Sequence, residues 1–138
     1  MSKDFQNPDI IRKILGGSTT IAVVGISNKP DRPSYEVADY LKVNGYRIIP
    51  VNPNIDEVLG EKAYPDLASI PERVDVVDIF RRSEDVGPVV DEAIKAGAKA
   101  VWIQLGIVND VAAEKASRSG LDVVMDRCIK VEHRRIYG

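Results

Sequence analysis

Thr19-Thr20-Ile21-Ala22-Val23-Val24-Gly25-Ile26-Ser27-Asn28-Lys29-Pro30-Asp31-Arg32-Pro33-Ser34 is the stretch that decides the predicted fold. A short apolar run ends at Gly25, a polar and cationic loop follows, and Ser34 is the expected N-cap of a helical pattern. A strand, a glycine turn and a helix N-terminus in succession bind phosphates, because backbone N–H groups and the positive end of the helix dipole converge there. The stretch therefore predicts a loop that holds the phosphates of a nucleotide.

Length and composition are those of an ordinary globular chain. The 138 residues fit one domain, 1–138, with 44% hydrophobic and 29% charged residues. A formal net charge of −2 gives no bulk preference for nucleic acid, and no apolar run approaches the ~18 residues of a membrane span. Met1 to Asn7 lack the apolar core of a secretion signal, and the single Cys128 excludes an internal disulfide and a cysteine metal cage. We therefore expect a cytoplasmic protein with no nucleic-acid or membrane partner and no metal site.

Strand and helix patterns alternate along the chain. Strands are expected over 20–24, 46–49, 74–80, 99–103 and 121–125, and helices over 7–17, 34–45, 84–97 and 109–120. The prolines after residue 49 are expected to end the second strand, 55–71 to form no full crossover helix, and 129–138 to pack as a loop or a short helix. This order predicts the α/β class, as a single Rossmann-like doubly wound domain with a five-stranded, mainly parallel sheet flanked by helices.

Cationic residues follow the ends of several predicted strands. In a doubly wound sheet, ligands bind beyond the carboxyl ends of the strands, where the strand order switches. The loops expected at that edge carry Lys29, Arg32, Arg81, Arg82 and Arg127. Either these are ordinary loop residues, or they serve an anionic, phosphate-bearing ligand, and their concentration on one rim of a slightly acidic protein favours the ligand.

A nicotinamide dinucleotide is the first candidate, and two features oppose it. Gly25-Ile26-Ser27-Asn28-Lys29 lacks the second glycine of the G-x-G-x-x-G pattern that lets a pyrophosphate approach closely. The second strand runs into Pro50-Val51-Asn52-Pro53, without the acid that binds a ribose 2′-hydroxyl. NADP, coenzyme A and simpler phosphorylated nucleotides remain, and the pattern alone does not separate them.

Five motifs together resemble one family. They are Val23-Val24-Gly25-Ile26-Ser27 with Lys29-Pro30 and Arg32-Pro33-Ser34, Pro50-Val51-Asn52-Pro53, Phe80-Arg81-Arg82, Trp102-Ile103-Gln104-Leu105-Gly106, and Asp126-Arg127-Cys128-Ile129-Lys130. In this order, over nearly the whole chain, they resemble the small stand-alone coenzyme A-binding proteins, which are similar to the coenzyme A-binding domain of the succinyl-CoA synthetase α subunit.

The resemblance implies a ligand and a set of contacts. The ligand would be coenzyme A or an acyl-CoA. The residues that would contact its pyrophosphate and nearby groups are Gly25, Ile26, Ser27, Asn28, Lys29, Arg32 and Ser34. Its adenosine would be bordered by Val51, Asn52 and Pro53, and its adenine side would be lined by Phe80 and Arg81. Gln104 and Gly106 would approach the pantetheine, and Cys128 is a further candidate contact.

Residues for a reaction are not evident in the sequence. Ser27 has no partner histidine at a recognisable spacing, and His133 lies in a basic tail, where a structural or hydrogen-bonding role is favoured over catalysis. Asp75 and Asp78 are expected to flank the core of the third strand. Cys128 is either a small buried residue or a thiol near the pantetheine thiol that forms a mixed disulfide with it, with Arg127 favouring the thiolate.

Three functions stay open at this point. The favoured one is a non-catalytic coenzyme A-binding module, sensor or subunit, because the sequence carries no catalytic set. A second is a component of an acyl-CoA ligase or thioester enzyme that needs residues from a partner chain, and a third is an NAD(P)-binding redox protein. The sequence is compatible with a homodimer or with a partner subunit, and it does not reveal the acyl group.

Overall fold

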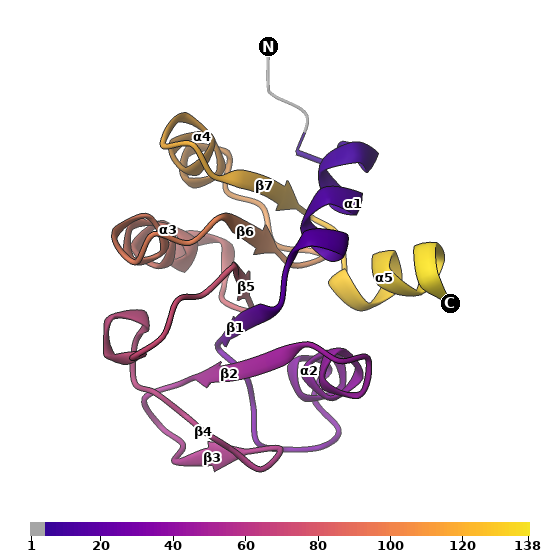
Figure 1. Cartoon of the computed structure of the whole chain (residues 1–138). Coiled ribbons are helices and arrows are strands. Elements are labelled where there is room, and N and C mark those ends of the chain that lie inside the picture. The colour runs from indigo at the N-terminus through magenta and orange to yellow at the C-terminus, as the bar shows by residue number, and fades with distance from the viewer. Residues whose placement is uncertain (1–4) are drawn as a thin grey trace.

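The computed structural model describes residues 5–138 (Figure 1). Residues 1–4, which belong to the segment Met1 to Asn7 considered above for a secretion signal, lie outside the described residues. The elements are α1 (Pro8–Gly17), β1 (Thr20–Val24), α2 (Pro33–Val43), β2 (Arg47–Val51), β3 (Glu57–Val58), β4 (Glu61–Lys62), η1 (Leu67–Ser69), β5 (Val76–Ile79), η2 (Ser83–Asp85), α3 (Val86–Lys95), β6 (Ala100–Ile103), α4 (Asp110–Arg118), β7 (Asp122–Met125) and α5 (Ile129–Tyr137).

Five of the strands form one parallel sheet in the order β2-β1-β5-β6-β7. The chain leaves β1 toward β2 on one side and then returns to β5 on the other, so the strand order reverses between β1 and β5. The predicted α/β, doubly wound fold is confirmed. The crevice at such a reversal is where doubly wound sheets hold their ligands.

Helices cover both faces of the sheet (Figure 1). Helices α1, α2 and α5 pack on one face of the sheet, and helices α3 and α4 pack on the other. Each face has one apolar cluster, which its helices share with the sheet. β1 is buried along its whole length because its neighbours β2 and β5 flank it and helices lie above and below. A continuous apolar run such as 20–24 is therefore what a central strand of this sheet requires.

Strand β2 extends through Pro50, and the expectation that the prolines end it at residue 49 is wrong. β2 lies at the edge of the sheet, where its outer side meets only an isolated bridge between Val51 and Tyr64. On that side the Pro50 carbonyl accepts a hydrogen bond from the Tyr64 N–H at 3.0 Å. The N–H that proline lacks would point the same way, so its absence removes no hydrogen bond to β1.

The segment between β2 and β5 holds the β3–β4 hairpin and the η1 turn, and it contains no full crossover helix, as expected. The tail forms α5, which resolves the choice between a loop and a short helix. Asn7 and Asn109 cap α1 and α4 with their side chains, as predicted. No helix within residues 5–138 is both long and apolar enough to cross a membrane.

Candidate functional site

Gly25 forms the turn that leaves β1 at the strand-order reversal. Its φ is +87°, a conformation that favours glycine, and its N–H donates to the Val51 carbonyl at 2.9 Å. A Cβ at this position would lie 2.0 Å from the Phe80 carbonyl oxygen and 3.3 Å from Nη1 of Arg81. The turn therefore packs directly against the backbone that follows β5, and the Arg81 guanidinium lies beside it.

Ser34 ties the loop to the helix in a different way from the predicted N-cap. The N-cap of α2 is Arg32, which makes no side-chain capping bond, and Pro33 occupies the first helical turn, so the prediction of Ser34 as the N-cap is wrong. Ser34 is buried, and its Oγ accepts the Ser27 N–H at 2.9 Å. Ser27 Oγ in turn accepts the Lys29 N–H at 3.0 Å. These two hydroxyls fix the shape of the loop 27–34.

Asn52 joins the end of β2 to the same loop. Its Nδ2 donates to the Ile26 carbonyl at 2.9 Å, and its Oδ1 accepts the Asn54 N–H at 2.8 Å. Ile26 and Val51 are buried, so they contribute to the site through backbone and packing, whereas Pro53 is exposed at its rim. The loops after β1 and β2 thus form one connected wall.

The cations at this edge differ in how they are paired. Arg82 lies near Glu84 and Asp85, with N–O distances of 3.4 and 3.1 Å, and its charge is used within η2. Lys29, Arg32 and Arg81 have no ion-pair partner within the part of the chain that the structure describes. Positive charge is therefore left unneutralised around the Gly25 turn, which suits a polyanionic ligand.

The ends of β6 and β7 continue the edge. Gly106 has a φ of +84°, and its N–H donates to Oδ1 of Asp126 at 2.7 Å. Gln104 is buried, and its Oε1 accepts the Ile129 N–H at 3.2 Å at the start of α5. The Gln104 side chain therefore holds α5 in place. Cys128 is the half-buried N-cap of α5 and makes no side-chain capping bond.

Asp78 is a feature that the sequence analysis misplaced. It lies within β5 between buried residues and has no solvent exposure, instead of flanking the strand core. Neither carboxyl oxygen has a hydrogen-bond partner among the described residues, and burial raises the pKa of Asp78 well above its ordinary value. Burial therefore favours the protonated, neutral form of this carboxyl group, within the sheet that supports the site.

His133 has the hydrogen-bonding role that was favoured for it. Its Nδ1 lies 2.8 Å from the Tyr40 hydroxyl, and its ring contacts Tyr46 and Tyr137. Burial lowers the pKa of His133. This cluster joins α2 to α5.

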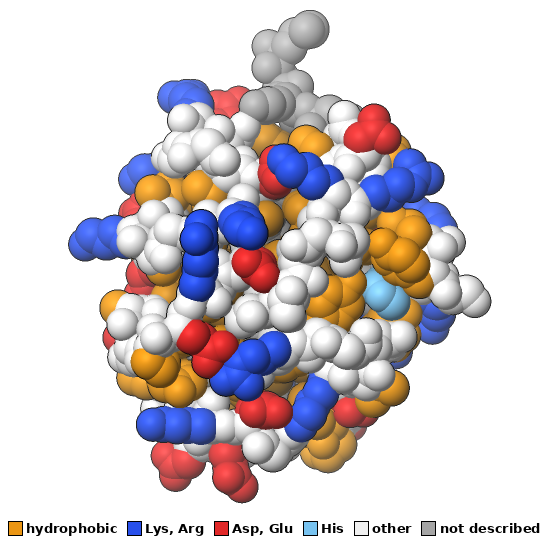
Figure 2. Space-filling view, in the orientation of Figure 1, with side chains coloured by type: hydrophobic (Ala, Val, Ile, Leu, Met, Phe, Trp, Pro, Cys, Tyr) orange, Lys and Arg blue, Asp and Glu red, His pale blue; other side chains and the backbone are white. Residues whose placement is uncertain are grey.

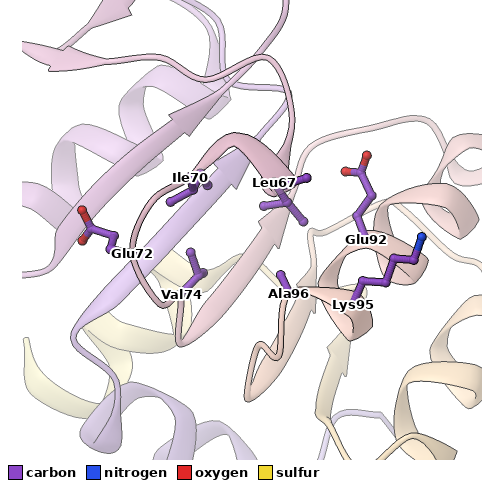
Figure 3. A pocket seen from close by; sticks show the side chains of 8 residues that line it. Leu67, Ile70, Glu72, Val74, Glu92, Lys95 and Ala96 are labelled. Atoms are coloured by element: carbon purple, nitrogen blue, oxygen red, sulfur yellow. The ribbon is translucent and has the colours of Figure 1, made fainter.

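A separate hollow of about 330 Å³ lies between η1 and the end of α3 (Figure 3). Leu67, Ile70, Val74 and Ala96 form its apolar wall, with Lys95 and Glu92 on the helix side. Val74 precedes the first residue of β5, so the hollow lies at the amino ends of the strands. None of the predicted site residues lines it.

Comparisons with known proteins agree on one family. A family model described as a CoA binding domain matches residues 19–134. The uncharacterised protein YneT of Bacillus subtilis is 46% identical over 131 residues, 94% of this chain and 97% of that protein. The solved structure of a hypothetical protein from Pyrococcus horikoshii superposes with a TM-score of 0.93 and 42% identity, covering 100% of this chain and 97% of that one.

Enzymes also match over part of their length. The ADP-forming acetate–CoA ligase II of Archaeoglobus fulgidus is 34% identical over 102 residues, 72% of this chain. The match covers 15% of the ligase. Most of the ligase therefore has no counterpart in this chain.

Proposed function

This chain belongs to the CoA binding domain family, and on that premise we propose that it binds coenzyme A or an acyl-CoA at the carboxyl ends of its strands. The pyrophosphate would lie against the backbone of the Gly25 turn, between Arg81 and the loop that carries Lys29 and Arg32. The adenosine would lie toward Asn52 and the end of β2. By itself the chain would act as a binding module, a sensor or a subunit.

The strand order supports one direction for the pantetheine arm in this proposal. β1 and β2 end beneath the nucleotide, so the arm extends over β5, β6 and β7. Neighbouring strands lie ~4.8 Å apart, and the three steps from β1 to β7 span roughly 14 Å. An extended pantetheine covers that distance, which would bring the thiol past Gly106 toward Cys128.

One observation carries this proposal: the turn at the strand-order reversal has room only for glycine, with Arg81 beside it and Lys29 and Arg32 on the loop that follows, and these three cations have no ion-pair partner among the described residues. The N–H groups of Gly25, Ser27 and Lys29 already donate within the protein, so a phosphate would be bound by the other amides of residues 25–29 and by these cations. An acidic protein gains nothing in stability from gathering like charges there, so a bound anion accounts for them best.

A thermal-shift comparison tests the proposal. A ligand that binds only the native state raises the free energy of unfolding by mass action, by about 2.7 kcal/mol at a ligand concentration of 100 Kd, and so raises the unfolding midpoint. Coenzyme A should raise the midpoint, and NAD at the same concentration should leave it unchanged. A shift with NAD and none with coenzyme A would overturn the assignment.

A second function, as a subunit of an acyl-CoA enzyme, has its own support. Leu105, Val108 and Val111 are exposed at 62, 46 and 82% in and after the loop that follows β6, beside the proposed pantetheine path. Relatives named as CoA ligases continue for several times the length of this domain. Affinity purification of the chain from its own host should then recover a second subunit, and Val111→Asp should abolish that recovery without changing coenzyme A affinity.

A further inference from the structure

A second cleft opens at the same edge of the sheet, between α1 and α5. The two helices lie side by side on one face of the sheet (Figure 1). The cleft measures about 370 Å³, and its walls include Gln6, Arg12, Arg127, Glu132, Arg135 and Ile136. Gln6 and Arg127 stand at its inner end, because Gln6 Nε2 donates to the carbonyl of Met125, the last residue of β7.

The charges in this cleft do not cancel. Three arginines face one carboxylate, that of Glu132, whose side chain is only 8% exposed and which pairs with Arg135 at 3.1 Å. Within residues 5–138, the ion-pair contact of Arg12 is a long one, 3.9 Å to Asp9. Figure 2 shows Lys and Arg side chains, with Asp and Glu side chains among them, over this part of the surface.

Among the described residues, the Arg127 guanidinium donates hydrogen bonds to neutral oxygen atoms only. Its Nη1 donates to the Asp126 carbonyl and its Nη2 to Oε1 of Gln6, each at 2.8 Å. These two bonds fix the guanidinium without neutralising it. A pre-positioned guanidinium suits a carboxylate, which it binds through short, charge-assisted hydrogen bonds.

Both helices begin near the inner end of the cleft. Asn7 and Cys128 occupy the N-cap positions of α1 and α5, so the positive ends of two helix dipoles lie close to Arg127. The cleft therefore combines fixed positive charge with apolar walls from Ile11 and Ile136. That combination suits a short aliphatic chain with an anionic end.

We infer that this cleft receives the acyl group of a bound thioester, and that the acyl group carries a terminal carboxylate. The inference rests on the proposed function, because the pantetheine path ends at Cys128, next to Arg127. A ligand thiol at that position would have the cleft directly beyond it. Acyl groups without a charged end would leave the Arg127 and Arg12 charges uncompensated.

Matched thioesters test this inference by calorimetry on the full chain. Succinyl-CoA and butyryl-CoA both carry four-carbon acyl groups and differ in the terminal carboxylate. Succinyl-CoA should bind at least about tenfold more tightly, with a preference that shrinks as salt is raised. Arg12→Gln should reduce the preference severalfold while leaving the affinity for free coenzyme A unchanged. Arg118→Gln, at an exposed position on α4, should preserve the preference.

The outcomes separate this inference from the proposed function. Equal affinities for the two thioesters, or tighter binding of butyryl-CoA, would overturn the inference and leave coenzyme A binding intact. A preference for succinyl-CoA that survives in both Arg12→Gln and Arg127→Gln would also overturn it, since the carboxylate would then bind elsewhere. If neither thioester nor free coenzyme A binds, the proposed function fails together with the inference.

Discussion

Replacement of Gly25 by alanine is the sharpest perturbation of the proposed phosphate-binding turn. The added Cβ would lie 2.0 Å from the Phe80 carbonyl oxygen, which is backbone and cannot rotate away. The turn and the segment after β5 must separate by more than ~1 Å to restore an ordinary contact. Two hydrogen bonds hold them in place, from Gly25 N–H to Val51 and from Phe80 N–H to Val24, at 2.9 and 2.8 Å.

The magnitude has two parts. Holding alanine at a φ of +87° costs about 1 kcal/mol. Displacing the turn and weakening its two hydrogen bonds adds about 1–3 kcal/mol. The free energy of unfolding should therefore fall by about 2–4 kcal/mol, and the midpoint by roughly 3–4 °C for each kcal/mol in a chain of this length.

Gly120→Ala is the matched control. Gly120 has a φ of +92°, close to that of Gly25, and no atom lies within 4 Å of its Cβ position. This variant should show the conformational cost alone, about 1 kcal/mol, and should bind coenzyme A like the wild type. Chemical unfolding and calorimetry on both variants separate strain from loss of ligand. Equal destabilisation of the two, or unimpaired coenzyme A binding by Gly25→Ala, would refute the reasoning.

Three further predictions concern single side chains. Arg81→Ala should weaken coenzyme A binding by about 10- to 100-fold in calorimetry, because a charge-assisted phosphate contact contributes about 1.5–3 kcal/mol. The same variant should leave the unfolding midpoint of the free protein nearly unchanged, and an unaltered Kd would place the phosphates elsewhere. Asp78→Asn should gain stability relative to wild type as pH rises above about 4. The reason is that Asp78 in the unfolded chain loses its proton near its ordinary pKa, whereas the pKa of the buried group in the folded protein is raised. Parallel curves of stability against pH for the two proteins would exclude a buried neutral acid. Incubation with the disulfide dimer of coenzyme A should add the mass of one coenzyme A to the protein, since the Cys128 thiolate attacks the dimer, forms the mixed disulfide and releases one coenzyme A thiol; an equal adduct on Cys128→Ser, or none on wild type, would end that hypothesis.

The fold followed from patterns that are local in the sequence. Apolar runs bounded by glycine and asparagine marked the strands and helix ends, and their alternation allows few topologies. Pro50 was misjudged because its tolerance depends on which side of β2 lacks a neighbour, a fact of sheet order and not of the local sequence. The family resemblance of the five motifs is confirmed by the comparisons.

The site was predictable as a set of loops and less so as a set of contacts. Gly25 was chosen for its motif, and only the structure places it against Phe80. Ser34 fits an N-cap in sequence, yet Pro33 begins the helix one residue earlier and leaves the hydroxyl for the Ser27 N–H. The hydrogen-bond partners of Gln104 and Arg127, which are Ile129 and Gln6, lie 25 and 121 residues away in the sequence, so no local pattern predicts these contacts. Asp78 was misplaced because a single acid in an apolar run fits a strand flank as well as a strand centre.

Backbone amide resonances during a titration with coenzyme A test the central claim most directly. We expect the largest changes in ¹H–¹⁵N spectra on the amides of 25–29, Asn52, Arg81 and Gly106, at the carboxyl ends of the strands. Amides beside the hollow between η1 and α3 should stay unchanged. Saturable changes confined to that hollow, or none at millimolar coenzyme A, would contradict the claim.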